Sequence, residues 1–445
     1  MFLTDYCPKS SFRCIPLWLL FSILLAHSSN AQVEVDSVYT KKYIDKSTSF
    51  AWMTFGGDVL HLQGGTTEFI QDGLVQSTSF GASSLPRITI GGIHFWGHTD
   101  FYVTFPLSFL QLQNQPEGFD EFTYRQGIET GARIYPFKIK PNALRPFAGI
   151  SFRSLIYNQK REGESYKHNA PNYERMIVPL QFGLTYATKK SLFTASAYYQ
   201  FKDKFSYHIS PTQTGTVKLE PLSFNLSYTK YWDGDRHARK EKAIKQFNVK
   251  HHVLKKEKRL STWYAGIGPS GSLQRTRSPY LKNNLPHLYH DFIGGFTPDI
   301  TFGRYFHRPD MNVGLSYRFM IDQLEGYDTK LQVGRHSIMA ESYKFLFNWL
   351  GFVPFAGITA SVENLSVKVN REHYQETKPA LGIIFGWDIR VTQTDTNLLR
   401  TNLRWTPNLH LSINGDKMMF DHLEFNFIQW VHFFGRKKAY DKYRK

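Results

Sequence analysis

Apolar and polar residues alternate strictly along several segments of the chain. In residues 100–109, one face carries Phe101, Val103, Phe105, Leu107 and Phe109. The same period of two recurs in 178–186, 222–229 and 381–389. Alternation over about ten residues is typical of a β-strand that crosses a membrane as part of a barrel wall. The pattern predicts an all-β, antiparallel, up-and-down transmembrane barrel.

The polar faces of these strands are rich in Ser, Thr, Asn, Gln and Gly and carry isolated charges, among them Glu129, Arg133 and Arg153. A soluble β-sandwich would instead place its charged residues on a solvated outer face. We therefore interpret the polar face as a crowded lumen. These three residues lie on neighbouring predicted strands and are expected to pair and brace the interior. In an open lumen they would also help to set ion selectivity.

The periodicity predicts about sixteen strands. The first eight lie near 50–62, 86–95, 100–109, 124–135, 146–157, 176–187, 191–202 and 220–232. The second eight lie near 261–273, 297–306, 311–320, 335–346, 353–363, 378–391, 397–412 and 420–432. In the first half, long polar gaps (63–85, 110–123, 158–175, 203–219) alternate with short ones (96–99, 136–145, 188–190). Outer-membrane barrels have long external loops and short periplasmic turns, and this alternation fits them.

The second half repeats the first. Four matches keep chain order: 88–91 with 300–303, Asp100 and Val103 with Asp310 and Val313, the identical PFAGI of 146–150 and 354–358, and 222–226 with 423–427. A fixed order of matches indicates duplication of one structural unit. We therefore divide the chain into a first repeat (32–232), a basic linker (233–260), a second repeat (261–435) and a basic tail (436–445).

The two repeats can form one barrel or two. We favour a single sixteen-strand barrel, because full closure of one wall leaves no free sheet edge. The alternative is two tandem eight-strand barrels, which a linker as long as 233–260 would suit. The choice matters because sixteen strands can leave an aqueous channel, whereas the interior of eight is filled by side chains.

The N-terminus predicts export. Lys9 and Arg13 precede an apolar run over 15–26, and a small-residue cleavage site ends at Ala31, so residues 1–31 form a signal peptide. An N-terminal anchor is the alternative, but the run is too short to span a bilayer as a helix. Both cysteines, Cys7 and Cys14, lie in this segment. The mature chain would therefore have no disulfide or thiolate.

Glycine–aromatic strands such as RPFAGISF (145–152) and WYAGIGPS (263–270) resemble those of the small eight-stranded outer-membrane protein A-like barrels. The start of the mature chain at Ala31-Gln32 is similar to export signals common in Bacteroidetes. These resemblances imply a barrel fold and the outer membrane of a Gram-negative bacterium. They imply no particular activity.

The chain is basic, with a formal net charge of +17 and ten Lys and Arg in residues 233–260. We expect a basic helix within 236–258, on the periplasmic side. Outer-membrane lipid is the expected partner, and the basic linker would either bind anionic envelope components or be a solvated margin. Nucleic acid is not expected as a partner, because an exported protein does not meet it.

The leading functional hypothesis is a passive pore or small-solute transporter. The alternative is a non-conducting barrel with a structural or binding role through its external loops. A hydrolase of envelope lipid is third, because no G-x-S-x-G motif is present. His251, His252, His287 and His290 lack a recognised metal-site spacing, so no metal, cofactor or catalytic residue is assigned.

Overall fold

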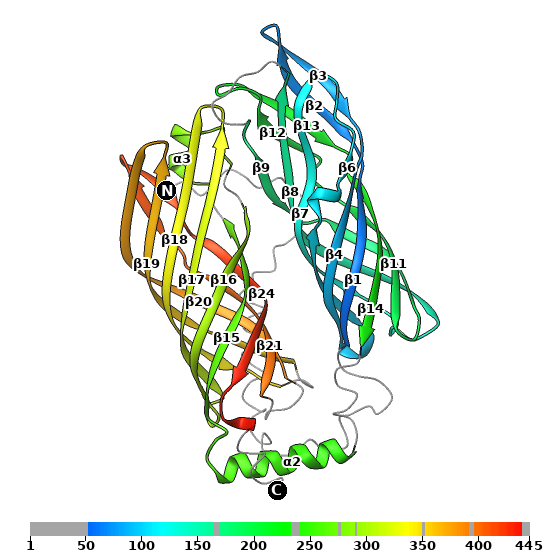
Figure 1. Ribbon diagram of the computed structural model, residues 1–445, viewed down its shortest axis with the longest axis vertical. Helices are drawn as coiled ribbons and strands as arrows, with labels where there is room; N and C mark the ends of the chain where they lie inside the picture. The colour runs from blue at the N-terminus through cyan, green and yellow to red at the C-terminus, as the bar shows by residue number, and fades with distance from the viewer. Residues whose placement is uncertain are drawn as a thin grey trace, which may run out of the picture. The chain divides into compact units, whose positions relative to one another are not determined.

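The structure is a computed structural model that describes residues 52–162, 170–232, 241–274, 277–289, 292–348, 352–390 and 396–437 (Figure 1). The predicted signal peptide (1–31) lies outside the described residues, as does most of the basic tail. Among the described helices, none is long and apolar enough to cross a membrane.

Eight strands of the first half form a closed antiparallel ring, here called barrel 1. Each strand pairs with the next, and the last pairs back with the first, so that Trp232 lies opposite Met53. The strands are β1 (Trp52–Leu62), β4 (Ser83–His94), β5 (Thr99–Pro106), β7 (Phe119–Ile134), β8 (Ala143–Arg161), β10 (Leu180–Ala187), β11 (Ser191–Tyr199) and β14 (Leu222–Trp232).

Eight strands of the second half close a ring of their own, here called barrel 2, in which β24 pairs back with β15. The strands are β15 (Thr262–Gln274), β16 (Phe292–Phe306), β17 (Met311–Gly326), β18 (Thr329–Phe345), β19 (Phe352–Val369), β20 (Glu372–Ile389), β21 (Asn397–Trp405) and β24 (His422–Phe433). In the sequence, α2 (Glu241–Lys256) follows the first half and lies within the segment that was predicted to be helical.

The prediction of a single sixteen-strand barrel is wrong. The first and last strands of each half pair with each other, and no barrel strand of one half pairs with a barrel strand of the other within the described residues. Each ring of eight already satisfies the hydrogen-bonding edges of all its strands. Fusion into a larger ring would gain no further backbone bonds, so the architecture is that of two eight-strand barrels.

Each barrel has two different ends. The short connections 95–98, 135–142 and 188–190 of barrel 1 lie at what we call its turn end, and the longer connections lie at its loop end. In barrel 2, the connection 307–310 marks the turn end, at which β18 also ends and β19 begins.

The loop end of barrel 1 differs from prediction, because the gaps 63–85 and 203–219 are not irregular loops. They form a four-stranded sheet of β2 (Gly65–Gln71), β3 (Leu74–Phe80), β12 (Lys204–His208) and β13 (Thr214–Leu219). This sheet packs on the barrel strands through aromatic rings: Phe80 lies 5.2 Å from Tyr124, and Phe205 lies 5.5 Å from Tyr157, between ring centroids. Short β6 (Leu112–Gln113) and β9 (Tyr173–Ile177) pair at the same end.

The loop end of barrel 2 is filled by apolar side chains. The short helix α3 (Pro279–Asn284) and the hairpin β22–β23 (His410–Ile413, Asp416–Met419) contribute Leu281, Leu411 and Met418. These pack with Leu331 and Val367 of the extended barrel strands, and each of the five is at most 1% exposed. This end of the barrel is therefore closed from within.

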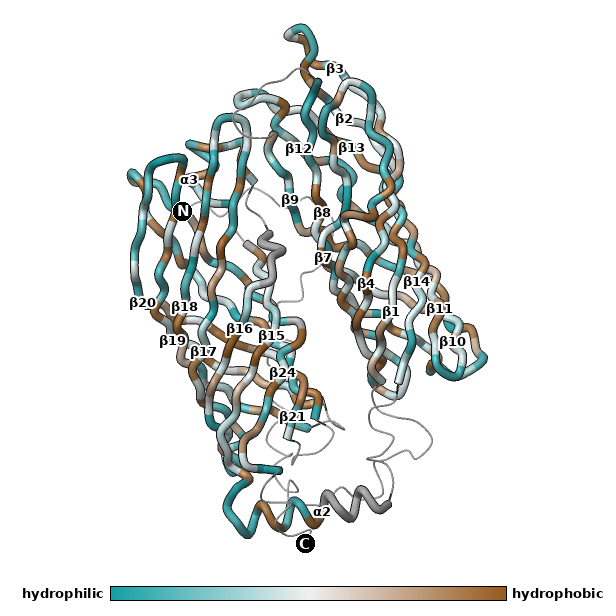
Figure 2. The backbone as a smooth tube through the Cα atoms, viewed as in Figure 1, coloured by the Kyte–Doolittle hydropathy of each residue, from teal (hydrophilic) through white to brown (hydrophobic). Residues whose placement is uncertain are grey.

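Three of the four matched segments fall entirely on strands of the same rank in the two rings, and in the fourth Val103 and Val313 lie on the third strands while Asp310 precedes β17. Residues 88–91 and 300–303 lie on the second strands, 146–150 and 354–358 on the fifth, and 222–226 and 423–427 on the eighth. The outward wall is apolar, and Figure 2 shows brown and pale residues following one another along the barrel strands. On β14 the outward-facing residues are Leu222, Phe224, Leu226, Tyr228, Lys230 and Trp232.

Candidate functional site

Arg87, on β4, is the centre of the buried polar layer in barrel 1. Its Nε donates to Asp58 Oδ1 at 2.5 Å, and its Nη1 donates to Glu129 Oε2 at 2.7 Å. None of these three side chains is more than 1% exposed. Asp58 lies directly across the β1–β4 ladder from Arg87, whereas Glu129 reaches it from β7. One arginine therefore joins two carboxylates from opposite sides.

Arg133 forms a second buried pair, toward the turn end. Its Nη1 donates to Asp100 Oδ2 at 2.8 Å, and its guanidinium carbon lies 4.1 Å from the ring centroid of Tyr102. The Tyr102 hydroxyl in turn donates to Glu129 at 2.7 Å and accepts from Gln181 at 2.8 Å. Tyr102 thus links the two ion pairs into one hydrogen-bonded network.

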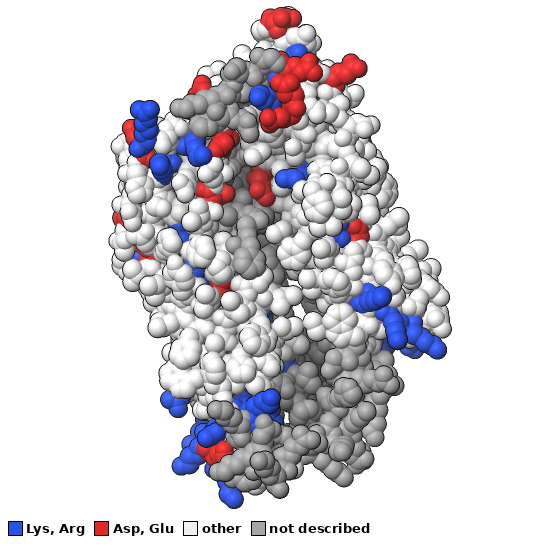
Figure 3. Space-filling view, in the orientation of Figure 1, with Lys and Arg blue, Asp and Glu red and all other residues white. Residues whose placement is uncertain are grey.

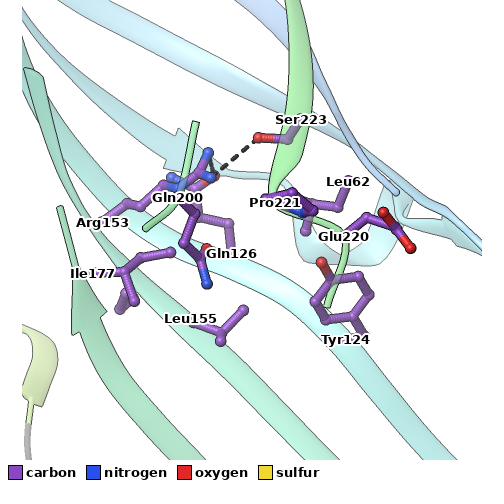
Figure 4. Close-up of a pocket in the computed structure, with 11 residues that line it drawn as sticks. Leu62, Tyr124, Gln126, Arg153, Leu155, Ile177, Gln200, Glu220, Pro221 and Ser223 are labelled. Carbon is purple, nitrogen blue, oxygen red and sulfur yellow. Dashed lines mark hydrogen bonds between the residues drawn. The ribbon is translucent and has the colours of Figure 1, made fainter. Parts of the chain in front are cut away.

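Arg153 is also buried, but among the described residues no carboxylate forms an ion pair with it. Its Nη2 donates to Ser223 Oγ at 3.1 Å, and its guanidinium carbon lies 4.9 Å from the centroid of Tyr198 (Figure 4). It lines a cavity of about 10 Å³, with Gln126 and Glu220 among the other lining residues. That volume is about the minimum that a single water needs.

The three predicted residues therefore meet in one lumen, but not in the predicted way. Glu129 and Arg153 are direct register partners, yet Glu129 forms its ion pair with Arg87. Arg133 pairs with Asp100, which lies opposite it on β5. The prediction missed Asp58, Arg87 and Asp100 as members of the network. The signal that could have found them is the one used for the others, an isolated charge on the polar face of a strand.

Barrel 2 holds a larger network of the same kind. Arg335 bridges Glu363, at 2.8 Å, and Glu424, at 2.7 Å, while Asp388 accepts from both Arg400 and Arg390. Arg404 pairs with Asp299 and Glu341. Its members with little exposure are Arg318, Arg335, Arg390, Arg400, Arg404, Asp299, Glu341, Glu363, Asp388 and Glu424. These side chains are at most 12% exposed.

Both polar layers are balanced in charge. Barrel 1 buries three arginines and three carboxylates, and the ion-paired network of barrel 2 joins five of each. Apolar clusters flank each layer: Tyr135 and Phe147 lie at the turn end of barrel 1, and Phe345 and Phe433 at that of barrel 2. A water-filled pore would expose the charges that line it. At these layers the two interiors are instead packed with side chains that are almost fully buried.

The outer wall of barrel 1 carries a separate polar pair. His61 Nδ1 lies 3.0 Å from Ser84 Oγ, on an exposed part of the β1–β4 ladder. No carboxylate is recorded as a partner of His61 within the described residues. Among those same residues, no group of three or more His, Cys, Asp or Glu side chains is arranged to hold a metal ion.

Comparisons with known proteins find remote structural likeness. No protein-family model and no curated protein matches the chain. Neisserial surface protein A is 17% identical and covers 39% of this chain and 96% of its own, with a TM-score of 0.26. The transport unit of the autotransporter AIDA-I from Escherichia coli is 8% identical over 93% of this chain and 96% of its own, with a TM-score of 0.19. OmpT, an outer membrane protein of Vibrio cholerae, is 8% identical over 85% of this chain and 100% of its own, with a TM-score of 0.17. At these scores the likeness carries no functional argument.

Proposed function

We propose that this chain is a non-conducting outer-membrane protein, in which two barrels act as membrane anchors and the loop end of barrel 1 is the working surface. The observation that carries the proposal is the buried, charge-balanced layer of side chains across each lumen. The apolar outward wall supports membrane insertion, because such a face suits contact with lipid. By the usual rule for outer-membrane barrels, the loop ends face the outside and the turn ends the periplasm.

The leading hypothesis from sequence, a passive pore, fits this geometry poorly. An eight-strand barrel leaves an interior just wide enough for side chains. In barrel 1 the side chains of Arg87, Asp58 and Glu129 occupy it with at most 1% exposure. The four-stranded sheet β2–β3–β12–β13, by contrast, extends the protein beyond the wall and shares an aromatic core with the barrel strands. Surface loops and projections of this kind commonly carry binding residues.

Planar-bilayer recording of the refolded full-length protein tests the proposal. We expect no steady conductance steps from the wild type. The double variant Arg87→Ala/Glu129→Ala, which shortens two side chains of the layer, serves as a comparison that opens the lumen of barrel 1. Steady ohmic steps from folded wild-type protein would overturn the proposal and restore the pore.

One observation favours a second candidate, the envelope-lipid hydrolase. A serine hydroxyl within hydrogen-bond reach of a histidine is the minimal arrangement of a nucleophile with its base. His61 and Ser84 have that arrangement on a wall that would face lipid. Without a described carboxylate behind His61, we expect the wild type and Ser84→Ala to cleave acyl esters equally slowly. Ester cleavage that both Ser84→Ala and His61→Ala abolish, with the fold intact, would establish the hydrolase.

A further inference from the structure

The turn end of barrel 1 is basic. Its connections 95–98, 135–142 and 188–190 contain Lys138, Lys140, Lys189 and Lys190 but no Asp or Glu. Figure 3 shows a group of basic side chains over the tip of the β10–β11 hairpin. A surface that carries cations without exposed carboxylates attracts anions and does not neutralise itself.

Lys230 adds a further cation on the outward wall of the barrel. On the outward row of β14, it is the first charged residue after Leu222, Phe224, Leu226 and Tyr228, and it is exposed. Trp232 follows it and is 48% exposed. Lysine near the end of a membrane-spanning segment extends its ammonium to the headgroup level, where Trp and Tyr also gather. Lys230 therefore lies at the depth of lipid headgroups.

Two hydroxyl-bearing residues neighbour Lys230 on the outward face. Ser191, at the start of β11, lies directly opposite Lys230, and its Oγ is 3.2 Å from the Tyr228 hydroxyl. Lys190 precedes Ser191 on the hairpin. Two ammonium groups and two hydroxyls above the apolar ring of Phe193, which is 48% exposed, suit an oxyanion attached to an apolar tail. A phosphate headgroup with its acyl chains has that chemistry.

Barrel 2 carries a comparable cation on its own wall. Arg304 faces outward on β16, lies opposite Trp263 in register and has its guanidinium carbon 5.7 Å from that ring. The Trp263 ring stacks on Phe302 at 5.3 Å. An outward cation therefore lies near the turn end of each barrel, although only Arg304 contacts an aromatic ring within the described residues.

We propose that the wall of barrel 1 formed by Lys190, Ser191, Tyr228 and Lys230 binds the phosphate of an anionic glycerophospholipid in the leaflet at the turn end. The site rests on membrane insertion but not on whether the lumen conducts. It also moves the expected binding of anionic envelope components from the linker 233–260 to the barrel wall. The apolar residues directly below the cations favour a lipid over a soluble phosphate.

Lipid competition on the full-length protein tests the site. Refolded protein in nanodiscs of mixed phosphatidylglycerol and phosphatidylcholine is extracted, and the ratio of the retained lipids is measured by native mass spectrometry. We expect enrichment of phosphatidylglycerol, and the variant K190Q/K230Q should lower it by about fivefold for each lysine removed. The matched control K202Q/K204Q changes the net charge equally at the loop end and should retain the enrichment.

A second variant distinguishes binding at a defined site from general electrostatic attraction. S191A/Y228F keeps every charge, and we expect it to lower the enrichment as well, because it removes both hydroxyl donors. Equal enrichment in wild type and K190Q/K230Q would overturn the proposal, as would an equal loss in K202Q/K204Q or no effect of S191A/Y228F. Displacement of the lipid by millimolar glycerol phosphate would overturn the choice of a membrane lipid. Heat-modifiable migration on gels confirms that each variant is folded.

Discussion

At the scale of single residues, the two lumens conserve charge balance rather than particular side chains. The match of 88–91 with 300–303 aligns Arg87 of barrel 1 with Asp299 of barrel 2, so equivalent positions carry opposite charges. Both nevertheless lie in networks with equal numbers of arginines and carboxylates. Burial of an unpaired charge costs several kcal/mol, whereas a paired and hydrogen-bonded one is tolerated. Balance of buried charge is therefore the feature that the two barrels share.

Replacement of Arg87 should be more costly than replacement of Arg153. In Arg87→Met, Asp58 and Glu129 are left buried without their shared cation, and we expect a loss of about 3–5 kcal/mol in the free energy of unfolding. Arg153→Met removes a cation with no described ion-pair partner and should cost about 1–3 kcal/mol. Urea unfolding in detergent micelles measures both. Equal losses would mean that the Arg87 bridge does not hold the layer together.

Tyr157 predicts a pH dependence at the loop end of barrel 1. It lies beyond the first ten residues of β8, which suffice to cross a membrane, and burial raises its pKa well above the ordinary value. A tyrosine whose folded-state pKa is raised contributes its full stability below its unfolded value of about 10, and that contribution is lost as the pH rises further. The hydroxyl donates to Thr67 at 2.7 Å, so neutral Tyr157 is stabilising.

Unfolding free energies of wild type and Tyr157→Phe should therefore differ at pH 8 and converge above pH 10. Tyr199, which is 42% exposed, supplies the control, because Tyr199→Phe should follow the wild type throughout. A gap between wild type and Tyr157→Phe that stays constant up to pH 11 would contradict the burial of this hydroxyl.

At the scale of strands, the repeated PFAGI segment explains a glycine on the neighbouring strand. Phe147 lies opposite Gly183, and Phe355 lies opposite Gly386. A Cβ at Gly183 would be 2.7 Å from Phe147 Cζ, and one at Gly386 would be 2.8 Å from Phe355 Cζ. The aromatic ring of the fifth strand thus covers the backbone of the sixth in both barrels, which is a reason for both residues of the pair to persist.

Gly183→Ala and Gly386→Ala should each destabilise their own barrel by about 1–3 kcal/mol, because the ring and a backbone carbonyl must move. Gly81→Ala is the control, since nothing lies within 4 Å of a Cβ there, and it should change the free energy of unfolding by less than about 0.5 kcal/mol. Urea unfolding of the full-length protein measures these changes in the free energy of unfolding. A neutral effect in only one of the two variants would show that the paired strands are not equivalent.

Strand positions were well predicted, whereas strand lengths were not. The alternation places every barrel strand, because each strand turns one face to the lumen and the other outward. It underestimates β17, expected to end at residue 320 and observed to reach Gly326, since pairing continues beyond the apolar band. There the strand is held by backbone bonds and by pairs such as Glu325 with Lys330, at 3.0 Å. Because these polar extensions of the strands have the composition of a loop, the alternation does not identify them as strand.

The candidate network was predictable as a set of charges but not as a set of partners. Glu129, Arg133 and Arg153 are recognisable as isolated charges on polar faces. Their partners depend on register and on which strands become neighbours when the ring closes. Asp58 meets Arg87 because β1 pairs with β4 in a particular register, and Glu129 meets Arg87 across the lumen. The period-two alternation of a single strand specifies neither the register nor the neighbouring strands.

At the scale of the whole molecule, the alternation of polar and apolar residues does not determine whether the chain forms one barrel or two. Alternation is the same in a ring of eight and a ring of sixteen, because each strand has one polar and one apolar face in both. What distinguishes them is whether β14 pairs with β1 or with a strand of the second half. Its ladder runs from Met53↔Trp232 to Leu62↔Ser223 along the whole of β1. Because the edge of β14 is paired with β1 from Met53 to Leu62, it is not free to pair with a strand of the second half, which closes into a ring of its own.

Closure within each half predicts that the halves fold independently. Residues 32–232 and 241–445, each refolded separately in detergent, should give heat-modifiable barrels with β-sheet circular dichroism, because no barrel strand pairs across the linker in the described chain. Each half also retains its own balanced set of buried charges, so separation leaves no buried cation or carboxylate without its counterpart. If neither half folded alone and the two together regained structure, the strands would have to be shared, and the closure of β14 on β1 would be refuted.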